Sequence, residues 1–281
     1  MAVETLKERP SLAGVFARAA LSRGRSGSTL PDRSLRQEGV AVDRGNLVDY
    51  QRLCGWDVSD VLPHTYPHVL GFPLQAALMG GEGFPLPLMG LVHVENVITV
   101  HRTLTTSDSL DITVRAADLR PHAKGRQVDL LTDVAVDGHL VWEGRSTYLA
   151  RGKGDPAAKS GSRPPGIPNG CAAAQWRLGA DLGRRYAAVS GDVNPIHLFG
   201  VTAKAMGFKA AIAHGMWSYA RVLAALGSAA RGPATSHVWF RKPILLPSQV
   251  QLVVGDEGEK SVAALRSARN TDIDHLVLTV G

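Results

Sequence analysis

The sequence predicts an α+β protein built from two diverged copies of one unit, each a helix followed by antiparallel strands. The segments Tyr50–Gly55 and Tyr186–Gly191 can be overlaid, and residues 93–114 and 237–254 both begin with His-Val before an apolar run. Three segments of the first half alternate in polarity and are rich in Val, Leu and Thr: Leu110–Leu119, Gly125–Val136 and Leu140–Ala150. Such self-similarity indicates an internal duplication.

Two irregular stretches divide the chain. Residues 151–170 are rich in Gly, Pro, Lys and Ser and cannot maintain a periodic pattern, and residues 22–34 form a second such stretch. We therefore expect an N-terminal extension over 1–34, an N-terminal unit over 35–150, a linker over 151–170 and a C-terminal unit over 171–281. For the extension we expect a surface helix followed by a loose arm.

Composition excludes several classes of protein. A chain of 281 residues with 44% hydrophobic and 20% charged residues can bury a sizeable core. The only cysteines, Cys54 and Cys171, provide no disulfide framework and no metal cluster. No apolar run reaches bilayer length, and the short run Leu12–Leu21 is interrupted by Arg18. We expect a cytoplasmic enzyme without a signal peptide.

The segment from Tyr186 to Trp217 contains a carboxylate, an amide and an imidazole at close spacing. Asn194 followed by Pro195 predicts a helix start, with Asn as the N-cap and Pro at the first helical position. His197 is then the third helical residue, where the partial positive charge of the helix end disfavours imidazolium. The same field favours an ionised Asp192. A neutral His beside an ionised Asp can hold and deprotonate a water molecule.

A second helix start follows at Gly215. Apolar residues recur at helical spacing from Met216 to Leu226, so Gly215 stands at the first turn, where its N–H can approach an acceptor closely. A backbone N–H aimed at a carbonyl oxygen stabilises negative charge that develops there.

The run Tyr186-Ala-Ala-Val-Ser190-Gly191-Asp192-Val-Asn194-Pro195-Ile-His197, followed by Ala213-His214-Gly215-Met216, resembles the hydratase-2 motif of the MaoC-like (R)-specific enoyl-thioester hydratases. The clear resemblance covers about residues 172–281, and the first half is similar to the double-hotdog members of actinobacteria. The resemblance implies a double hotdog, two units that each wrap an antiparallel sheet around a central helix. It also implies that Asp192 and His197 position the catalytic water, that the Gly215 N–H polarises the thioester carbonyl and that Asn194 supports the loop. Ser190 and Gly191 belong to the implied substrate site, and Met206, Phe208 and Met216 are candidates for an acyl tunnel or for ordinary core.

The first half lacks this chemistry. In the overlay Trp56 takes the place of Asp192 and Val61 that of His197, so we expect a non-catalytic unit. Between Leu62 and Gly90, prolines and glycines leave only a short helical run near Leu74–Met79. By resemblance to the family, this reduced central helix makes room for a bulky acyl tail.

The resemblance implies reversible hydration of trans-2-enoyl thioesters to (R)-3-hydroxyacyl thioesters of medium to long chain in fatty-acid metabolism. The substrate handle is coenzyme A or acyl carrier protein. We expect no metal and no redox cofactor, because proton movements suffice for both bonds. We also expect no nucleic-acid partner, no membrane span, and a monomer or homodimer. Two alternatives stay open, namely a hotdog thioesterase in which Asp192 activates water against the carbonyl, and a non-catalytic acyl-binding module.

The net charge is +6, and several basic residues gather in the second half, where they form either a rim that attracts phosphates or acidic carrier protein, or ordinary solvated surface. These residues are Arg184, Arg185, Lys204, Lys209, Arg221, Arg241 and Lys242. We expect His214 to make a packing or hydrogen-bonding contact and Tyr186 to be core. Five other histidines lack ligand spacing and are expected to be structural: His64, His68, His93, His101 and His122.

Overall fold

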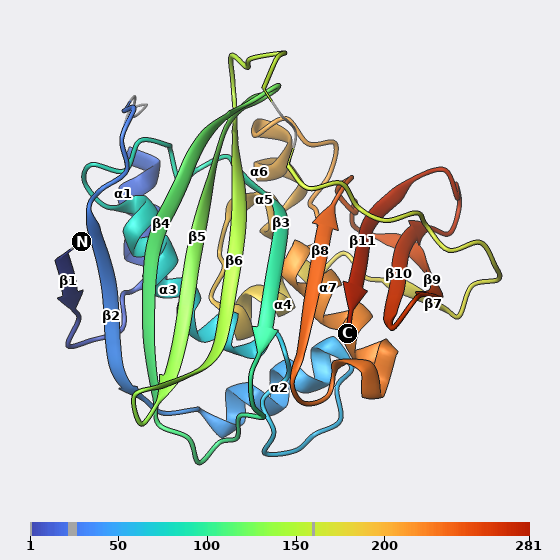
Figure 1. Cartoon of the computed structure of the whole chain (residues 1–281). Helices are drawn as coiled ribbons and strands as arrows, with labels where there is room; N and C mark the ends of the chain where they lie inside the picture. The colour runs from blue at the N-terminus through green and yellow to red at the C-terminus, as the bar shows by residue number, and fades with distance from the viewer. Residues whose placement is uncertain (1, 22–26, 159–160) are drawn as a thin grey trace.

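A computed structural model describes residues 2–21, 27–158 and 161–281, which form one eleven-stranded sheet with helices against one face (Figure 1). The strands are β1 (Ala2–Thr5), β2 (Arg33–Val40), β3 (Leu91–Val100), β4 (Leu110–His122), β5 (Gly125–Val136), β6 (His139–Arg151), β7 (Ala174–Leu178), β8 (Ala234–Phe240), β9 (Ser248–Glu257), β10 (Lys260–Ser267) and β11 (Asp274–Val280). Their order is β1-β2-β4-β5-β6-β3-β8-β11-β10-β9-β7. The predicted α+β class is confirmed.

The order of the strands shows two equivalent halves that share one sheet. Reading outward from the centre, β3, β6, β5, β4 and β2 on one side correspond to β8, β11, β10, β9 and β7 on the other. The halves join through an antiparallel ladder between β3 and β8, in which Glu95 lies opposite Trp239. The duplication predicted from the sequence is therefore present, with the two copies in one continuous sheet.

The helices are α1 (Leu12–Leu21), α2 (Arg44–Cys54), α3 (Tyr66–Gly80), α4 (Leu182–Ser190), α5 (Pro195–Leu198), α6 (Gly200–Ala205), α7 (Gly215–Leu226) and the 3₁₀ turn η1 (Gly227–Ala230). Helices α2 and α4 end in the same way, at Gly55 and Gly191 with φ of 81° and 73°. Only glycine adopts this left-handed conformation readily. The ring centroids of Tyr50 and Tyr186 lie 6.2 Å apart where the two helices meet.

The prediction of a short, reduced central helix in the first unit is wrong. Helix α3 runs without interruption from Tyr66 to Gly80 and is longer than α7, its counterpart. Pro67 lies in the first turn, where no N–H is needed. Pro73 removes the N–H that would bond to the Val69 carbonyl, and the guanidinium of Arg9, at 3.2 Å, donates to that carbonyl instead.

The N-terminal extension is more firmly attached than predicted. Helix α1 buries Val15 and Phe16, and the Val15 side chain lies against Gly80 at the end of α3. The predicted surface helix is thus half of a helix–helix contact. Strand β1 pairs in parallel with β2, and the part of the expected loose arm at residues 22–26 lies outside the described residues.

The position of Val61 also corrects the sequence overlay. Val61 forms an isolated bridge with Thr105, just as Ile212 does with Leu245 in the second half. Val61 is therefore the counterpart of Ile212, not of His197. The short helices α5 and α6, with His197 between Asn194 and Ile212, have no counterpart among the described residues of the first unit.

The segment predicted as a linker has no helix or strand over residues 161–170. It contacts the sheet at Ser162, whose hydroxyl donates to Glu95 Oε1 (2.9 Å) and accepts from the Trp239 indole N–H (2.7 Å). The domain boundaries at 34, 150 and 170 stay a prediction. Among the described residues, no helix is long and apolar enough to cross a membrane.

Candidate active site

The loop between α4 and α5 is held by its own side chains. Asn194 caps α5 as predicted, since its Oδ1 accepts from the Ile196 N–H at 3.4 Å and Pro195 opens the helix. Asp192 Oδ1 accepts from the Asn194 N–H (3.2 Å), and Ser190 Oγ accepts from the Asp192 N–H (3.2 Å). These short-range contacts determine where the Asp192 carboxylate stands.

The imidazole of His197 is fixed in one tautomer. Its Nδ1 lies 2.8 Å from the carbonyl oxygen of Ile212. Because a carbonyl can only accept, Nδ1 carries the proton and Nε2 of the neutral ring is left with a lone pair. Potential ligand atoms of Asp192, His197 and His214 lie within 4.8 Å of one another. The lone pair of His197 and the carboxylate of Asp192 are therefore close enough to share one water molecule.

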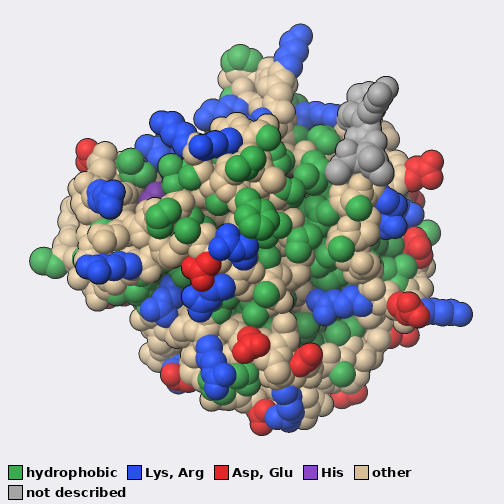
Figure 2. Space-filling view, turned by 180° about the vertical axis from the view of Figure 1, so that it is seen from behind, with side chains coloured by type: hydrophobic (Ala, Val, Ile, Leu, Met, Phe, Trp, Pro, Cys, Tyr) green, Lys and Arg blue, Asp and Glu red, His purple; other side chains and the backbone are tan. Residues whose placement is uncertain are grey.

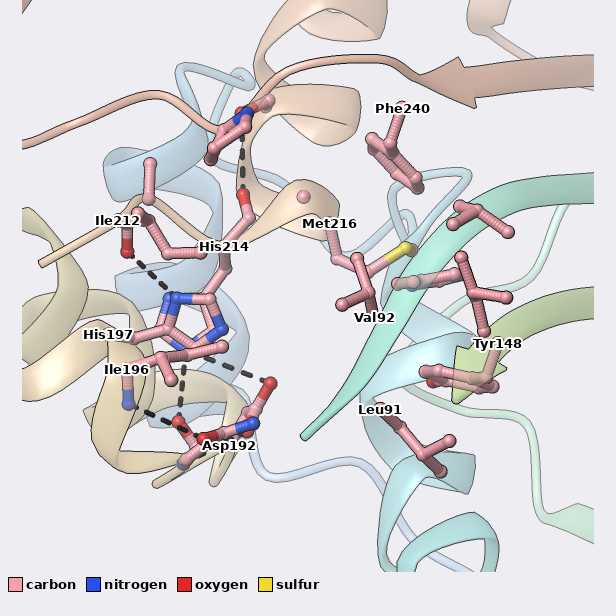
Figure 3. A pocket seen from close by; sticks show the side chains of 18 of the residues that line it. Leu91, Val92, Tyr148, Asp192, Ile196, His197, Ile212, His214, Met216 and Phe240 are labelled. Atoms are coloured by element: carbon pink, nitrogen blue, oxygen red, sulfur yellow. Dashed lines mark hydrogen bonds and ion pairs between the residues drawn. The ribbon is translucent and has the colours of Figure 1, made fainter. Parts of the chain in front are cut away.

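His214 positions its neighbours, in keeping with the prediction of a hydrogen-bonding role. Its Nε2 donates to the backbone carbonyl of Asp192 at 3.0 Å, and its ring stacks on that of His197 with centroids 3.7 Å apart (Figure 3). On the other side it contacts the ring of Tyr186 at 4.8 Å. Tyr186 is buried, as predicted. His214 thus links the loop of Asp192 to the ring of His197.

Burial controls the protonation of these groups. It raises the pKa of Asp192 above its ordinary value, although the nearby His197 and the Asn194 N–H oppose the shift. It lowers the pKa of His197, and that of His214 far more, so both rings are neutral at pH 7. The effect of burial on Asp192 is opposite in direction to the predicted effect of the helix end and exceeds it, because α5 has only four residues and its dipole is small. That Asp192 is ionised stays a prediction.

Gly215 opens α7 as predicted, so its N–H has no acceptor within the helix. A Cβ at this position would lie 3.0 Å from the ring of Phe240, so tight a contact that the ring would have to move by a few tenths of an ångström. The absence of a side chain lets Phe240 pack against the helix start and leaves the N–H open to a substrate oxygen.

These groups line a cavity of about 700 Å³ between the two halves. The predicted residues Ser190, Asp192, Asn194, His197, Phe208, Gly215 and Met216 all line it. Gly191 is not among the described lining residues: a Cβ there would lie 2.5 Å from the Leu12 side chain, so the glycine allows α1 to approach. Met206 does not line it either.

Sequence reasoning missed the opposite wall, which comes from the first unit. It includes Leu91, Val92 and Tyr148, which face the acid–base residues across the cavity (Figure 3). His68 and His93, taken as structural, also line it and continue into a ring stack with Tyr148, whose centroid is 4.6 Å from that of His93. Farther in, the cavity is apolar, with Phe16, Val69, Phe72, Met79 and Leu88. No local pattern marks these residues, because the fold brings them together from distant segments.

The basic residues that were predicted to form one rim lie at different places in the structure. Arg241 and Lys242 line the cavity, together with Lys124 and with Arg151 at the end of β6. Arg221 instead stacks on Trp176 at 4.5 Å, so it supports the fold. Lys and Arg side chains surround hydrophobic ones on the helix-bearing face (Figure 2).

The donor set of Asp192, His197 and His214 is close enough to suggest a metal ion, but its hydrogen bonds fit one poorly. Each histidine has one nitrogen committed to a carbonyl, and the two rings stack face to face. Metal-bound imidazoles point their lone pairs at a shared centre, which stacked rings do not do readily. The geometry suits a hydrogen-bonded water molecule better.

Comparison with known proteins identifies relatives of this chain. A MaoC-like domain matches residues 177–275. The chain is 37% identical over 235 residues to 3-hydroxyacyl-thioester dehydratase X of Mycobacterium tuberculosis, a match that covers 82% of this chain and 83% of that protein. The crystal structure of HtdX from the same organism superposes with a TM-score of 0.78 at 35% identity, over 88% of this chain and 99% of that one.

A MaoC-like dehydratase from Phytophthora capsici has the same fold, with a TM-score of 0.73 at 19% identity over 90% of this chain and 95% of that one. The double-hotdog architecture expected from the sequence is thus shared with these structures. Because the match to the Mycobacterium protein extends well beyond the motif and through both halves, the chain belongs to the family of MaoC-like dehydratases.

Proposed function

We propose that this protein is a hydro-lyase that reversibly adds water to trans-2-enoyl thioesters and forms (R)-3-hydroxyacyl thioesters. The observation that carries the proposal is the arrangement in one cavity of a carboxylate, a neutral imidazole with a free Nε2 lone pair, and the first N–H of a helix. The relative named 3-hydroxyacyl-thioester dehydratase supports the same reaction class.

In this mechanism the thioester oxygen accepts a hydrogen bond from the Gly215 N–H. Attack of water on C3 moves electron density toward that oxygen, and the N–H stabilises the developing enolate. The close contact of Gly215 with Phe240 keeps side-chain atoms out of this position. The residue therefore contributes through its backbone alone.

The attacking water donates one hydrogen bond to Asp192 and one to Nε2 of His197. We assign Asp192 as the main base because burial raises its pKa and makes the carboxylate more basic than an exposed one. His197 shares the proton, and the proton then returns to C2 on the same face of the substrate. The sum is addition of H and OH to the double bond, and dehydration is the same path in reverse. Proton transfers suffice for both steps, so we propose that no metal or redox cofactor takes part.

The proposed substrate has a medium to long acyl chain, which would extend into the apolar end of the cavity between Phe16, Phe72 and Met79. The handle is coenzyme A or acyl carrier protein, whose negative charges would meet Arg241, Lys242, Lys124 and Arg151. A role in cytoplasmic fatty-acid metabolism remains part of the proposal.

The test follows the loss of enoyl-thioester ultraviolet absorbance with purified protein, using crotonyl- and dodecenoyl-coenzyme A. We expect turnover of both, faster with the longer substrate, and its loss in Asp192→Asn and His197→Ala. If neither substrate reacts, the same enoyl groups on acyl carrier protein are tested next. Release of free thiol from a saturated acyl thioester without hydration would replace the hydratase proposal with a thioesterase.

A further inference from the structure

A second cavity, of about 410 Å³, lies between the first unit and residues 230–232 of the second, at the position that corresponds to the active site of the second unit. The correspondence follows from hydrogen bonds. The Leu62 N–H donates to the Leu104 carbonyl (2.8 Å), and the Ala213 N–H donates to the Ile244 carbonyl (2.9 Å) at the equivalent point of the other unit. Leu62 and Leu104 line the second cavity, while Ala213 and Ile244 line the first.

The walls of this second cavity are mainly apolar. Pro63, Pro67, Val100, Trp142 and Ala230 contribute to them. The charged lining residues, Asp57 and Arg231, form an ion pair with each other, and their side chains are 78% and 62% exposed. The charges therefore lie at the mouth, and the interior excludes an ion unless it is paired.

One polar atom in this wall lacks a partner. Trp56 Nε1 is buried and has no hydrogen-bond partner within the part of the chain that the structure describes. The ring of His64, by contrast, lies 2.6 Å from Ser236 Oγ through its Nε2 and also contacts the backbone of Ile98. Burial lowers the pKa of His64 to about 4, so the ring is neutral at pH 7. Native proteins rarely leave buried polar atoms unpaired, and a missing ligand is one reason for it.

We propose that the second cavity is a binding site for a neutral apolar molecule with one terminal hydrogen-bond acceptor, such as an acyl chain that ends in an ester, amide or thioester carbonyl. The carbonyl oxygen accepts a hydrogen bond from the Trp56 indole N–H, because this group can act only as a donor. A carboxylate is disfavoured because Arg231 is already paired with Asp57. Trp56 stands where the second unit has Asp192, so the site binds its ligand without converting it.

The test uses the full chain labelled with 5-fluorotryptophan and titrated with methyl octanoate, with fluorine NMR as the readout. The chain has five tryptophans. Trp56 and Trp142 line the second cavity, whereas Trp176, Trp217 and Trp239 line neither cavity. We expect saturable shifts of the Trp56 and Trp142 signals and constant positions for the other three. This readout is independent of turnover, so it stands even if the hydratase proposal fails.

Variants separate this site from the tunnel of the active site. Ala230→Leu fills the buried wall and Val61→Phe narrows the exposed mouth, and each should abolish the Trp142 shift. Trp56→Phe keeps the bulk but loses the donor, so affinity measured at Trp142 should fall about fivefold. Trp176→Phe is the matched control and should leave affinity unchanged. The proposal is overturned if neither signal shifts, if both filled variants bind as tightly as the parent, or if octanoate binds as tightly as its methyl ester.

Discussion

The two units of this chain use the same elements, and only the second has the full set of groups for acid–base chemistry. Both units have a helix that ends in a left-handed glycine, Gly55 or Gly191, and both continue to a bridge at Val61 or Ile212. The second unit inserts α5 and α6 before that bridge, and His197 lies on this insertion. The comparison shows that the second unit carries an acid–base residue on a segment that the first unit lacks, while the surrounding helices and strands are the same in both.

Of the changes predicted here to separate the two units, Asp192→Asn should have the largest effect on activity. Removing the carboxylate should lower kcat by at least ~10²-fold, the usual scale for a general base, and His197→Ala should do the same. Initial rates of enoyl-thioester hydration measure this. Asp49→Asn, on exposed α2 of the first unit, is the matched control. If Asp49→Asn lost as much activity as Asp192→Asn, the two units would not differ in their contribution to catalysis.

The pH profile should show the effect of burial. The proposed bases must be unprotonated, and burial moves the pKa of Asp192 up from 3.8 and that of His197 down from 6.5. Activity should therefore fall as the pH is lowered, with about tenfold loss per pH unit below a midpoint that lies above 3.8, the ordinary pKa of an Asp carboxyl group. Profiles of kcat/KM measure the midpoint. His101→Gln, on an exposed residue, should not move it, and a midpoint at or below 3.8 would contradict the assignment.

Gly215→Ala tests the contact at the start of α7. The added Cβ would meet the Phe240 ring at 3.0 Å, so the N–H should shift and kcat should fall about tenfold. Phe240→Leu in the same chain should restore part of the rate by making room. Gly200→Ala, where a Cβ meets nothing within 4 Å, serves as the control. Unchanged turnover in Gly215→Ala would remove the argument for a close approach at this point.

The contribution of the first unit to substrate choice is tested at Leu88. This buried residue lines the apolar end of the cavity. Leu88→Trp should lower kcat/KM for dodecenoyl-coenzyme A several-fold relative to crotonyl-coenzyme A, because only the longer chain reaches this end. Leu140→Trp, on an exposed residue of β6, should leave the ratio unchanged. A parallel decrease for both substrates would place the acyl chain elsewhere.

The smallest expected effect concerns the hydrogen bond that compensates Pro73. Arg9→Met leaves the Val69 carbonyl without its donor and should destabilise the protein by ~1 kcal/mol, as measured by urea unfolding. In a Pro73→Ala background, which supplies a new helix N–H, the same substitution should cost less. Lys7→Met, on an exposed neighbour, is the control. Equal costs in the two backgrounds would show that Arg9 does not act through this carbonyl.

The short-range features of the site were predictable from sequence, whereas its long-range partners were not. Asn194, Pro195 and Gly215 form the predicted helix starts because capping depends on adjacent residues. The continuity of α3 was not predictable, since it depends on Arg9, far from Pro73 in the sequence. Tyr148 could not be assigned to the cavity for the same reason. The effect of burial on the pKa of Asp192 could not be predicted either, because burial is a property of the whole fold.

The pairing of β3 with β8 has a consequence for how this molecule can be divided. Each unit, if produced alone, would expose a long unpaired strand at its edge. The free backbone N–H and C=O groups of such an edge can pair with a strand of another chain. The covalent connection between the units keeps the two edges at high effective concentration, so that each finds the other before it finds another chain. The segment over 151–170 thus acts as a tether that ensures correct assembly. Two fragments cut within it should behave as an obligate heterodimer rather than as two independent proteins.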